Sequence, residues 1–166
     1  MSTIRDRRSV RTYTDEKVTD EQVTELLKAA MSAPSAGNQQ PWCFVVIRSQ
    51  EVLDRIPSVH PYAAMTPQAS VVIAVCGDLT GLKYEGYWVQ DCSAATENIL
   101  LAAHEMGLGA VWLGVYPTDE RVEGVRGLLG LPEHVIPLSL VPVGHPVETP
   151  SPADRFDPGR VHHDRW

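Results

Sequence analysis

Three arginines and one serine stand close together near the N-terminus, in the run Arg7-Arg8-Ser9-Val10-Arg11. Arginine presents a planar, permanently charged fork that matches phosphate oxygens, and serine adds a neutral donor. This combination favours a phosphate-binding cradle. A solvated basic terminus would contain the same residues, and the cluster alone leaves both interpretations open.

Two later segments have residue types suited to a heteroaromatic ligand. The polar run 34–42 contains Asn38 and Gln40, whose side-chain amides both donate and accept hydrogen bonds. The alternative is a turn in which these amides bond their own backbone. Farther on, Gly114 lies at the end of an apolar run and would let a ligand or another backbone approach closely.

Other phosphate and metal motifs are missing from the sequence. Gly107 and Gly109 begin a Gly-x-Gly pattern, but Trp112 stands where a third glycine is needed, and Val115 follows Gly114 where a P-loop has lysine. No His-Glu-x-x-His or paired cysteine motif occurs, so no metal site is predicted. The 3 cysteines, odd in number, are expected to be reduced thiols.

The chain has 166 residues and a net charge of 14 − 21 = −7, which indicates one globular domain, residues 1–166. Its acidity argues against nucleic acid as a partner, because phosphate neutralisation requires excess Lys and Arg. No apolar run approaches the ~18 residues that span a bilayer, and no secretory signal follows the basic N-terminus. These observations predict a cytoplasmic protein that uses neither a membrane nor nucleic acid.

Alternating helices and strands should position these residues. A capping box at Thr19 and Gln22 predicts a helix that ends before Pro34. The runs 42–47 and 71–76 suit central strands buried on both faces, and 109–116 and 136–143 predict two more strands. Prolines push the last strand to an edge or a bulge. Helices are expected over 93–106 and after Thr118, which gives an α/β or α+β class.

The C-terminal segment, residues 145–166, contains four prolines and little periodicity. It is predicted to be either a disordered tail or an arm that packs on a second subunit. Burial of Phe156 and Trp166 would stabilise such an arm by roughly 1.5–3 kcal/mol each.

In their order along the chain, these segments resemble the flavin-dependent nitroreductase family, in its short bacterial form. The resemblance rests on five motifs that span nearly the whole sequence: Arg7-Arg-Ser-x-Arg11, Pro34-Ser-x-x-Asn38-x-Gln40-Pro-Trp42, Asp91 to Asn98, Gly107-Leu-Gly-x-x-Trp112-x-Gly114, and Pro142-Val-Gly-His145 with Asp154-Arg-Phe-Asp157. It implies an α+β fold with a mixed central sheet, and an intertwined homodimer that exchanges its C-terminal arms.

The resemblance also implies FMN in the subunit interface. By position, Arg7, Arg8, Ser9 and Arg11 would hold the phosphate and ribityl chain, with Arg11 reaching the pyrimidine edge; Pro34, Ser35, Asn38 and Gln40 would come from the opposite subunit; Trp112, Leu113 and Gly114 would place backbone near flavin N5 and O4; and Arg155 would close the phosphate site. Ala36 and Ala153 depart from the family pattern, in which Ser and Lys are common at these positions.

The implied activity is NAD(P)H-dependent, two-electron, ping-pong reduction of nitroaromatics, quinones or related small electrophiles. NADH or NADPH would be the donor, and no catalytic side chain is required because the flavin performs the electron chemistry. Three alternatives stay open: another flavin reaction on the same fold, such as enone reduction, dehalogenation or flavin cleavage; a non-catalytic flavin-binding module; and a structural domain without flavin.

Overall fold

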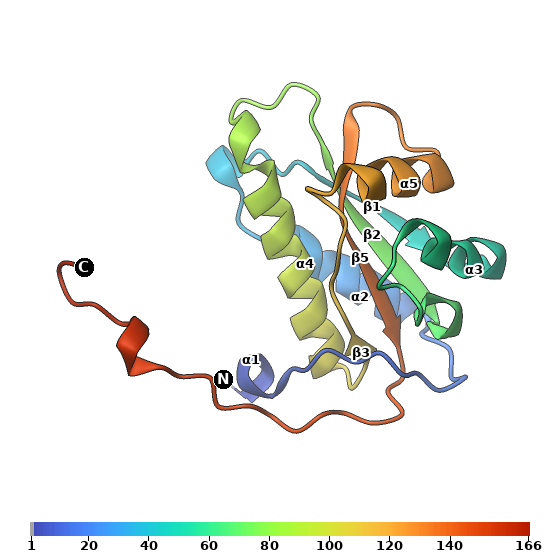
Figure 1. Cartoon of the computed structure of the whole chain (residues 1–166), viewed down its shortest axis with the longest axis horizontal. Helices are drawn as coiled ribbons and strands as arrows, with labels where there is room; N and C mark the ends of the chain where they lie inside the picture. The colour runs from blue at the N-terminus through green and yellow to red at the C-terminus, as the bar shows by residue number, and fades with distance from the viewer. Residues whose placement is uncertain (1) are drawn as a thin grey trace.

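A five-stranded sheet lies between two pairs of helices in the computed structural model, which describes residues 2–166 (Figure 1). The α-helices are α1 (Ser2–Asp6), α2 (Asp20–Met31), α3 (Gln50–Val59), α4 (Trp88–Glu105) and α5 (Asp119–Leu129). The strands are β1 (Trp42–Ile47), β2 (Val71–Asp78), β3 (Gly109–Ala110), β4 (Leu113–Gly114) and β5 (Val135–Gly144). Single 3-10 turns occur at Ala36–Asn38, Thr66–Gln68, Glu85–Tyr87 and Pro158–Arg160.

The strand order is β1-β2-β5-β3, and β4 also pairs with β5. All four ladders between these strands are antiparallel, and parallel pairing is confined to an isolated bridge between Ser9 and Ala110. The α+β class is therefore confirmed. The parallel part of the expected mixed sheet is reduced, within residues 2–166, to that single bridge.

Each face of the sheet is covered by its own hydrophobic core. Ile73 of β2 packs in the core beneath α2 and α4, whereas its neighbour Val72 packs in the core beneath α3 and α5. Successive strand residues point to opposite faces, so the continuous apolar run of β2 reaches both cores. Burial of β2 on both faces is confirmed. The expectation that β1 is also central is wrong: β1 ends the sheet and is only partly buried.

The capping box that starts α2 forms as predicted, with the Thr19 hydroxyl accepting from the Gln22 N–H and the Gln22 side chain accepting from the Thr19 N–H. Helix α4 begins five residues before the predicted start at Ser93. Gly107 follows α4 with φ +71°, the left-handed conformation expected of a glycine after a helix.

Helix α3 is not predicted by the sequence, because it contains Pro57. Proline lacks the N–H that would bond the carbonyl of Leu53, four residues earlier. In the structure the buried Thr66 hydroxyl lies 3.2 Å from the Leu53 carbonyl and 2.9 Å from the Ala63 carbonyl, and it shares its one hydrogen between them. A residue outside the helix therefore replaces part of the missing bond.

The prolines of β5 predict either an edge strand or a bulge. Strand β5 is central, so the edge position is wrong, and the bulge is confirmed. The register with β2 shifts between Val75 and Cys76, where Val75 pairs with Ser139 and Cys76 with Pro137. The bulged residue between them, Leu138, instead accepts from the N–H groups of Val115 and Tyr116. This shift accommodates proline inside the sheet. The predicted strand 109–116 divides into β3 and β4, which both pair with β5.

Helices α3 and α5 approach each other at a glycine. A Cβ on Gly124 would lie 2.8 Å from the Cβ of Val59, so only glycine allows this packing. We expect Gly124→Ala to lower the free energy of unfolding by about 1–3 kcal/mol, because the helices must separate. Gly127→Ala, at an open position of the same helix, should preserve or raise stability. Equal urea midpoints for the two variants would contradict this prediction.

Candidate functional site

Two of the sequence motifs meet in one cleft. This cleft, of about 420 Å³, is lined by residues from the N-terminal segment, the segment that follows α3, the β3–β4 region and α5: Arg11, His60, Tyr62, Ala64, Met65, Trp112, Leu113, Gly114 and Arg121. The structure thus brings Arg11 to the predicted backbone segment 112–114. We refer to it as the Gly114 cleft.

The backbone of Gly114 faces away from the sheet. Val115 donates its N–H to Leu138 of β5, and antiparallel ladders alternate between residues that bond their partner and residues that do not. Gly114, one residue earlier, therefore points both its N–H and its carbonyl away from β5. No atom lies within 4 Å of the position that a Cβ would take on Gly114. The residue is a backbone hydrogen-bonding position beside open space.

The carbonyl of Gly114 accepts two hydrogen bonds from side chains. His60 Nε2 lies 2.9 Å from this oxygen and Arg121 Nη1 lies 3.0 Å from it. The Tyr62 N–H donates to His60 Nδ1 at 3.3 Å, so Nδ1 is the acceptor and Nε2 carries the hydrogen. Neither His60 nor Arg121 was singled out from the sequence, because neither belongs to a local motif.

The N-terminal segment is fixed against β3. Val10 donates its N–H to the Ala110 carbonyl at 3.0 Å, and its side chain covers Gly109, where a Cβ would be only 2.6 Å away. The Tyr13 hydroxyl donates to the Val10 carbonyl at 2.8 Å, and burial raises the pKa of this hydroxyl. Ser9 forms the bridge to Ala110, and this anchoring leaves the Arg11 side chain exposed at the Gly114 cleft.

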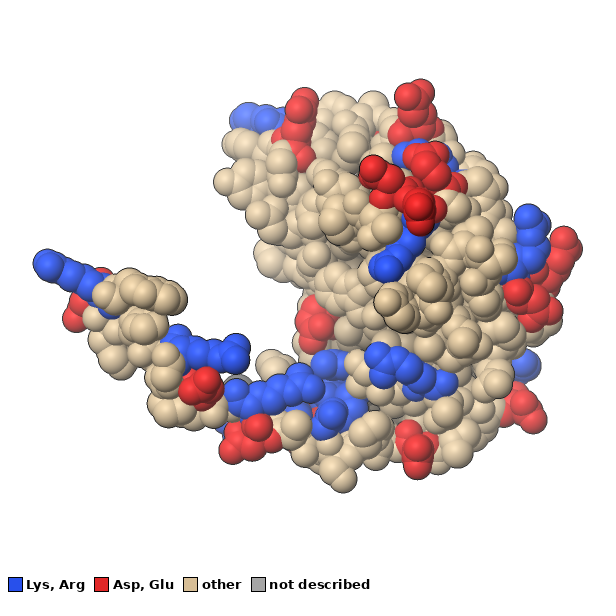
Figure 2. All heavy atoms as spheres, viewed as in Figure 1, with Lys and Arg blue, Asp and Glu red and all other residues tan. Residues whose placement is uncertain are grey.

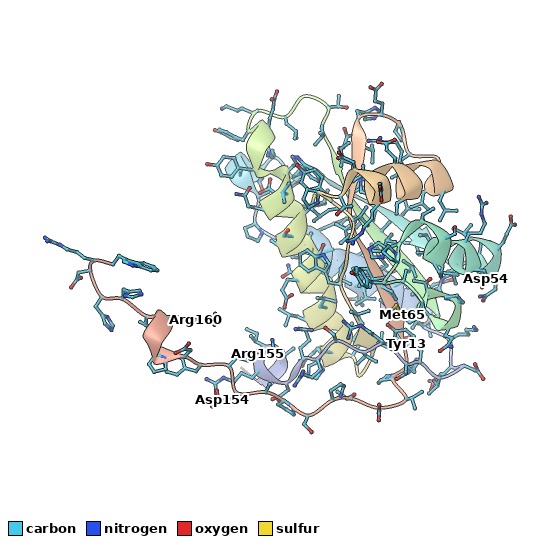
Figure 3. All side chains as sticks on the ribbon, in the orientation of Figure 1. Tyr13, Asp54, Met65, Asp154, Arg155 and Arg160 are labelled. Atoms are coloured by element: carbon cyan, nitrogen blue, oxygen red, sulfur yellow. The ribbon has the colours of Figure 1, made fainter. Side chains whose placement is uncertain are left out.

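A second cavity, of about 630 Å³, lies between α1 and the C-terminal segment and is lined by Arg7, Arg8 and Arg155 among others. Arg8 Nη1 donates to the Ser151 carbonyl, and Arg7 Nε lies 3.6 Å from Glu97 Oε1. Figure 2 shows basic side chains gathered along this edge of the molecule, and Figure 3 shows Arg155 beside α1. The predicted phosphate residues Arg7, Arg8 and Arg155 are therefore brought together.

The amide-rich loop lies elsewhere in the chain. Its Ala36 N–H donates to buried Asp91, near the start of α4, whereas Thr3 of α1 bonds Glu105 at the other end of that helix (Figure 1). Pro34, Ser35, Asn38 and Gln40 line neither cavity.

Within the loop, Gln40 donates to the Asn38 side chain at 3.1 Å, and its own N–H bonds Ser35 Oγ. In a single chain these two side-chain amides thus bond each other, and not the loop's own backbone as in the turn alternative. Asn38 and Gln40 have φ of +56° and +50°, so the loop has an unusual backbone that these local bonds support.

The three cysteines lie close together but outside both cavities. Cys43 and Cys76 are opposite each other on β1 and β2, and Cys92 Sγ is 3.6 Å from the Cys76 carbonyl. Burial raises the pKa of Cys92 to about 12, whereas the bond from the Cys76 thiol lowers that of Cys43. All three are free thiols.

Residues 2–166 hold neither a grouped set of metal ligands nor a membrane-spanning helix. No group of three or more His, Cys, Asp or Glu side chains in this range is arranged to hold a metal ion. None of its helices combines the length and apolar character needed to cross a bilayer.

Comparisons with known proteins identify the family. Residues 4–63 and 58–145 match the model of the Nitroreductase family. A protein of Methanothermobacter thermautotrophicus named "Putative NADH dehydrogenase/NAD(P)H nitroreductase" is 53% identical over 100% of this chain and 87% of its own length.

Solved structures agree with this match. "Putative NADH Oxidase" from Clostridium acetobutylicum has a TM-score of 0.96 and 41% identity, covering 99% of both chains. An "FMN-dependent Nitroreductase" from Clostridium difficile has a TM-score of 0.91 and 26% identity, again over 99% of both chains. With both the family model and these relatives matched along most of its length, the chain belongs to the nitroreductase family.

Proposed function

We propose that this chain is an FMN-dependent NAD(P)H oxidoreductase that reduces nitroaromatics, quinones or related small electrophiles. The observation that supports this most directly is the Gly114 cleft, where an outward-facing backbone N–H beside open space shares one site with the guanidinium of Arg11. The names of the relatives, which mention NAD(P)H and FMN, agree with this proposal.

The residues present fit FMN. Open space in front of Gly114 leaves room for a planar ring system, with Trp112 and Leu113 alongside. Arg7, Arg8 and Arg155 around the neighbouring cavity would hold the phosphate, and Ser9 lies between the two cavities along the chain. Arg11 would reach the pyrimidine edge.

Bound FMN would supply the reversible uptake of one hydride, which is two electrons and one proton. The chain would orient it through the Gly114 N–H and favour its more negative, reduced form through the positive charge of Arg11. Donor and acceptor would occupy the same cleft in turn, which is the ping-pong order. No acid or base side chain is assigned a proton-transfer role.

We further propose a homodimer in which the partner contributes Pro34, Ser35, Asn38 and Gln40 to each FMN site. In one chain this loop lines neither cavity, so a ligand that it shares with Arg11 requires a second copy. The C-terminal arm, 145–166, would pack on that partner. Phe156 and Trp166 are 78% and 101% exposed in the isolated chain, and β1 offers an unpaired edge.

Replacing Arg11 by alanine should lower the midpoint potential of the bound flavin, because a positive charge facing the cleft favours the reduced form. We expect a decrease of about 30 mV, the equivalent of a tenfold change for a two-electron couple. Arg11→Lys should recover most of this decrease. Arg55→Ala removes an equal charge from an exposed position of α3 and should leave the potential unchanged. An unaltered potential in Arg11→Ala would remove its assigned role.

The proposed function is tested by the absorption spectrum of purified protein, reconstituted with FMN, before and after NADPH or NADH under argon. We expect flavin bands that bleach with the nicotinamide donor and return when a nitroaromatic or quinone is added. Protein that takes up no FMN would contradict the proposal. Bound flavin that neither donor bleaches would identify a non-catalytic flavin-binding module instead.

A further inference from the structure

The Gly114 carbonyl accepts hydrogen bonds from one residue just after α3 and from one residue in α5, and neither residue belongs to a sequence motif. His60 directly follows α3 and is 2% exposed, and Arg121 lies in the first turns of α5. A carbonyl oxygen has two lone pairs, and these two contacts occupy both. Such saturation holds the carbonyl in one direction.

The packing of α3 on α5 explains why these donors converge. Gly124 lets α5 approach Val59, the last residue of α3. His60 is the next residue along the chain, and Arg121 lies three residues before Gly124, on the same side of α5. The helix contact therefore delivers both side chains to one point on β4.

The two donors are also tied to each other through Tyr62. Its N–H fixes the His60 ring, and the Arg121 guanidinium lies over its ring, 5.3 Å from the centroid. A guanidinium held over an aromatic ring has restricted freedom to turn toward solvent. His60, Tyr62 and Arg121 thus form one network around Gly114.

Glycine is the residue whose backbone is least restricted, so β4 would be most mobile at the position that faces the cleft. Val115 donates its N–H to Leu138 of β5, whereas Gly114, opposite Ser139, stands at a position of the ladder that makes no hydrogen bond to β5. We propose that His60 and Arg121 are positioning residues that fix the Gly114 backbone, so that its N–H points at the cofactor, with Arg121 also supplying positive charge at the cleft. This inference rests on the proposed function.

The consequence is specific to cofactor binding. The carbonyl and the N–H of Gly114 belong to the two peptide groups on either side of its Cα. Without these donors, rotation about the two backbone bonds of this Cα would be less restricted, and the bond from the N–H to the cofactor would be made only part of the time. The lost charge of Arg121 would weaken binding of the reduced cofactor more than that of the oxidised one. Affinity and potential should therefore change together.

The test uses full-length protein reconstituted with FMN and compares Arg121→Met, Arg121→Lys and the control Arg126→Met, which removes the same charge from α5 away from both cavities. For Arg121→Met we expect the FMN dissociation constant to rise about tenfold. We also expect its midpoint potential to fall by about 30 mV, the equivalent of a further tenfold loss for the reduced form. Arg121→Lys should recover part of both, and the control should match wild type.

A second pair of variants addresses His60 separately. His60→Gln keeps a side-chain donor and should retain most of the FMN affinity. His60→Leu should raise the FMN dissociation constant by about the same factor as Arg121→Met. Urea midpoints report whether each variant is folded. Wild-type affinity and potential in both Arg121→Met and folded His60→Leu would overturn the inference while leaving the proposed function intact. Wild-type protein that binds no FMN would overturn both.

Discussion

Gly114→Val should abolish tight FMN binding while leaving the protein folded, with an affinity loss of at least about 100-fold, or about 2.7 kcal/mol. A Cβ on Gly114 meets no atom within 4 Å, and its φ is outside the positive range, so the chain tolerates a side chain there. The same open space is where the cofactor ring would lie. Valine would fill it and hold the ring away from the backbone N–H.

The matched control is Gly127→Val, at an exposed and equally open position of α5. Helix propensity favours valine over glycine there, so stability should not fall. FMN affinity by fluorescence titration and unfolding by urea should be measured for both, with Gly114→Ala as an intermediate. If Gly114→Val bound FMN as tightly as the control, the cofactor would not approach this backbone, and the assignment of the cleft would be wrong.

How far the sequence predicts this fold depends on whether each determinant is local. The Thr19 capping box and the β2 run are complete within a few residues, and both form as predicted. Helix α3 is hidden because the donor that compensates for Pro57 is Thr66, which comes from another turn of the chain. The central place of β5 is likewise hidden, because a bulge against β2 accommodates its prolines.

In the candidate site, too, the residues that belong to local motifs are the ones that the sequence predicts. The motifs that resemble a known family predict that Arg11 meets Gly114 and that Arg7 and Arg8 meet Arg155. In the structure each of these groups lines one cavity. His60 and Arg121 have no such signal, because they meet only through the α3–α5 contact. Asn38 and Gln40 bond each other in the single chain. Their proposed role depends on a second copy, which no property of one sequence segment displays.

Removal of residues 149–166 should give a folded monomer that no longer retains FMN. Residues 145–147 bond the N-terminal segment, so the truncation leaves that pairing in place. Beyond them every residue from 148 onward is exposed, and the body of the protein loses little buried surface. The arm would instead be buried on the partner, and Arg155 would leave with it. Both the dimer and one phosphate contact should therefore be lost.

Light scattering and the ratio of flavin to protein absorbance measure the two losses. A full-length variant, Phe156→Ser with Trp166→Ser, keeps Arg155 but removes roughly 1.5–3 kcal/mol of burial at each position. This variant should raise the dissociation constant of the dimer at least ~100-fold, whereas Thr149→Ala in the same arm should leave it unchanged. Because the amide-rich loop lines neither cavity of its own chain, FMN should dissociate as the dimer does. A truncated chain that stays dimeric and yellow would show that the arm is dispensable and that other surfaces join the subunits.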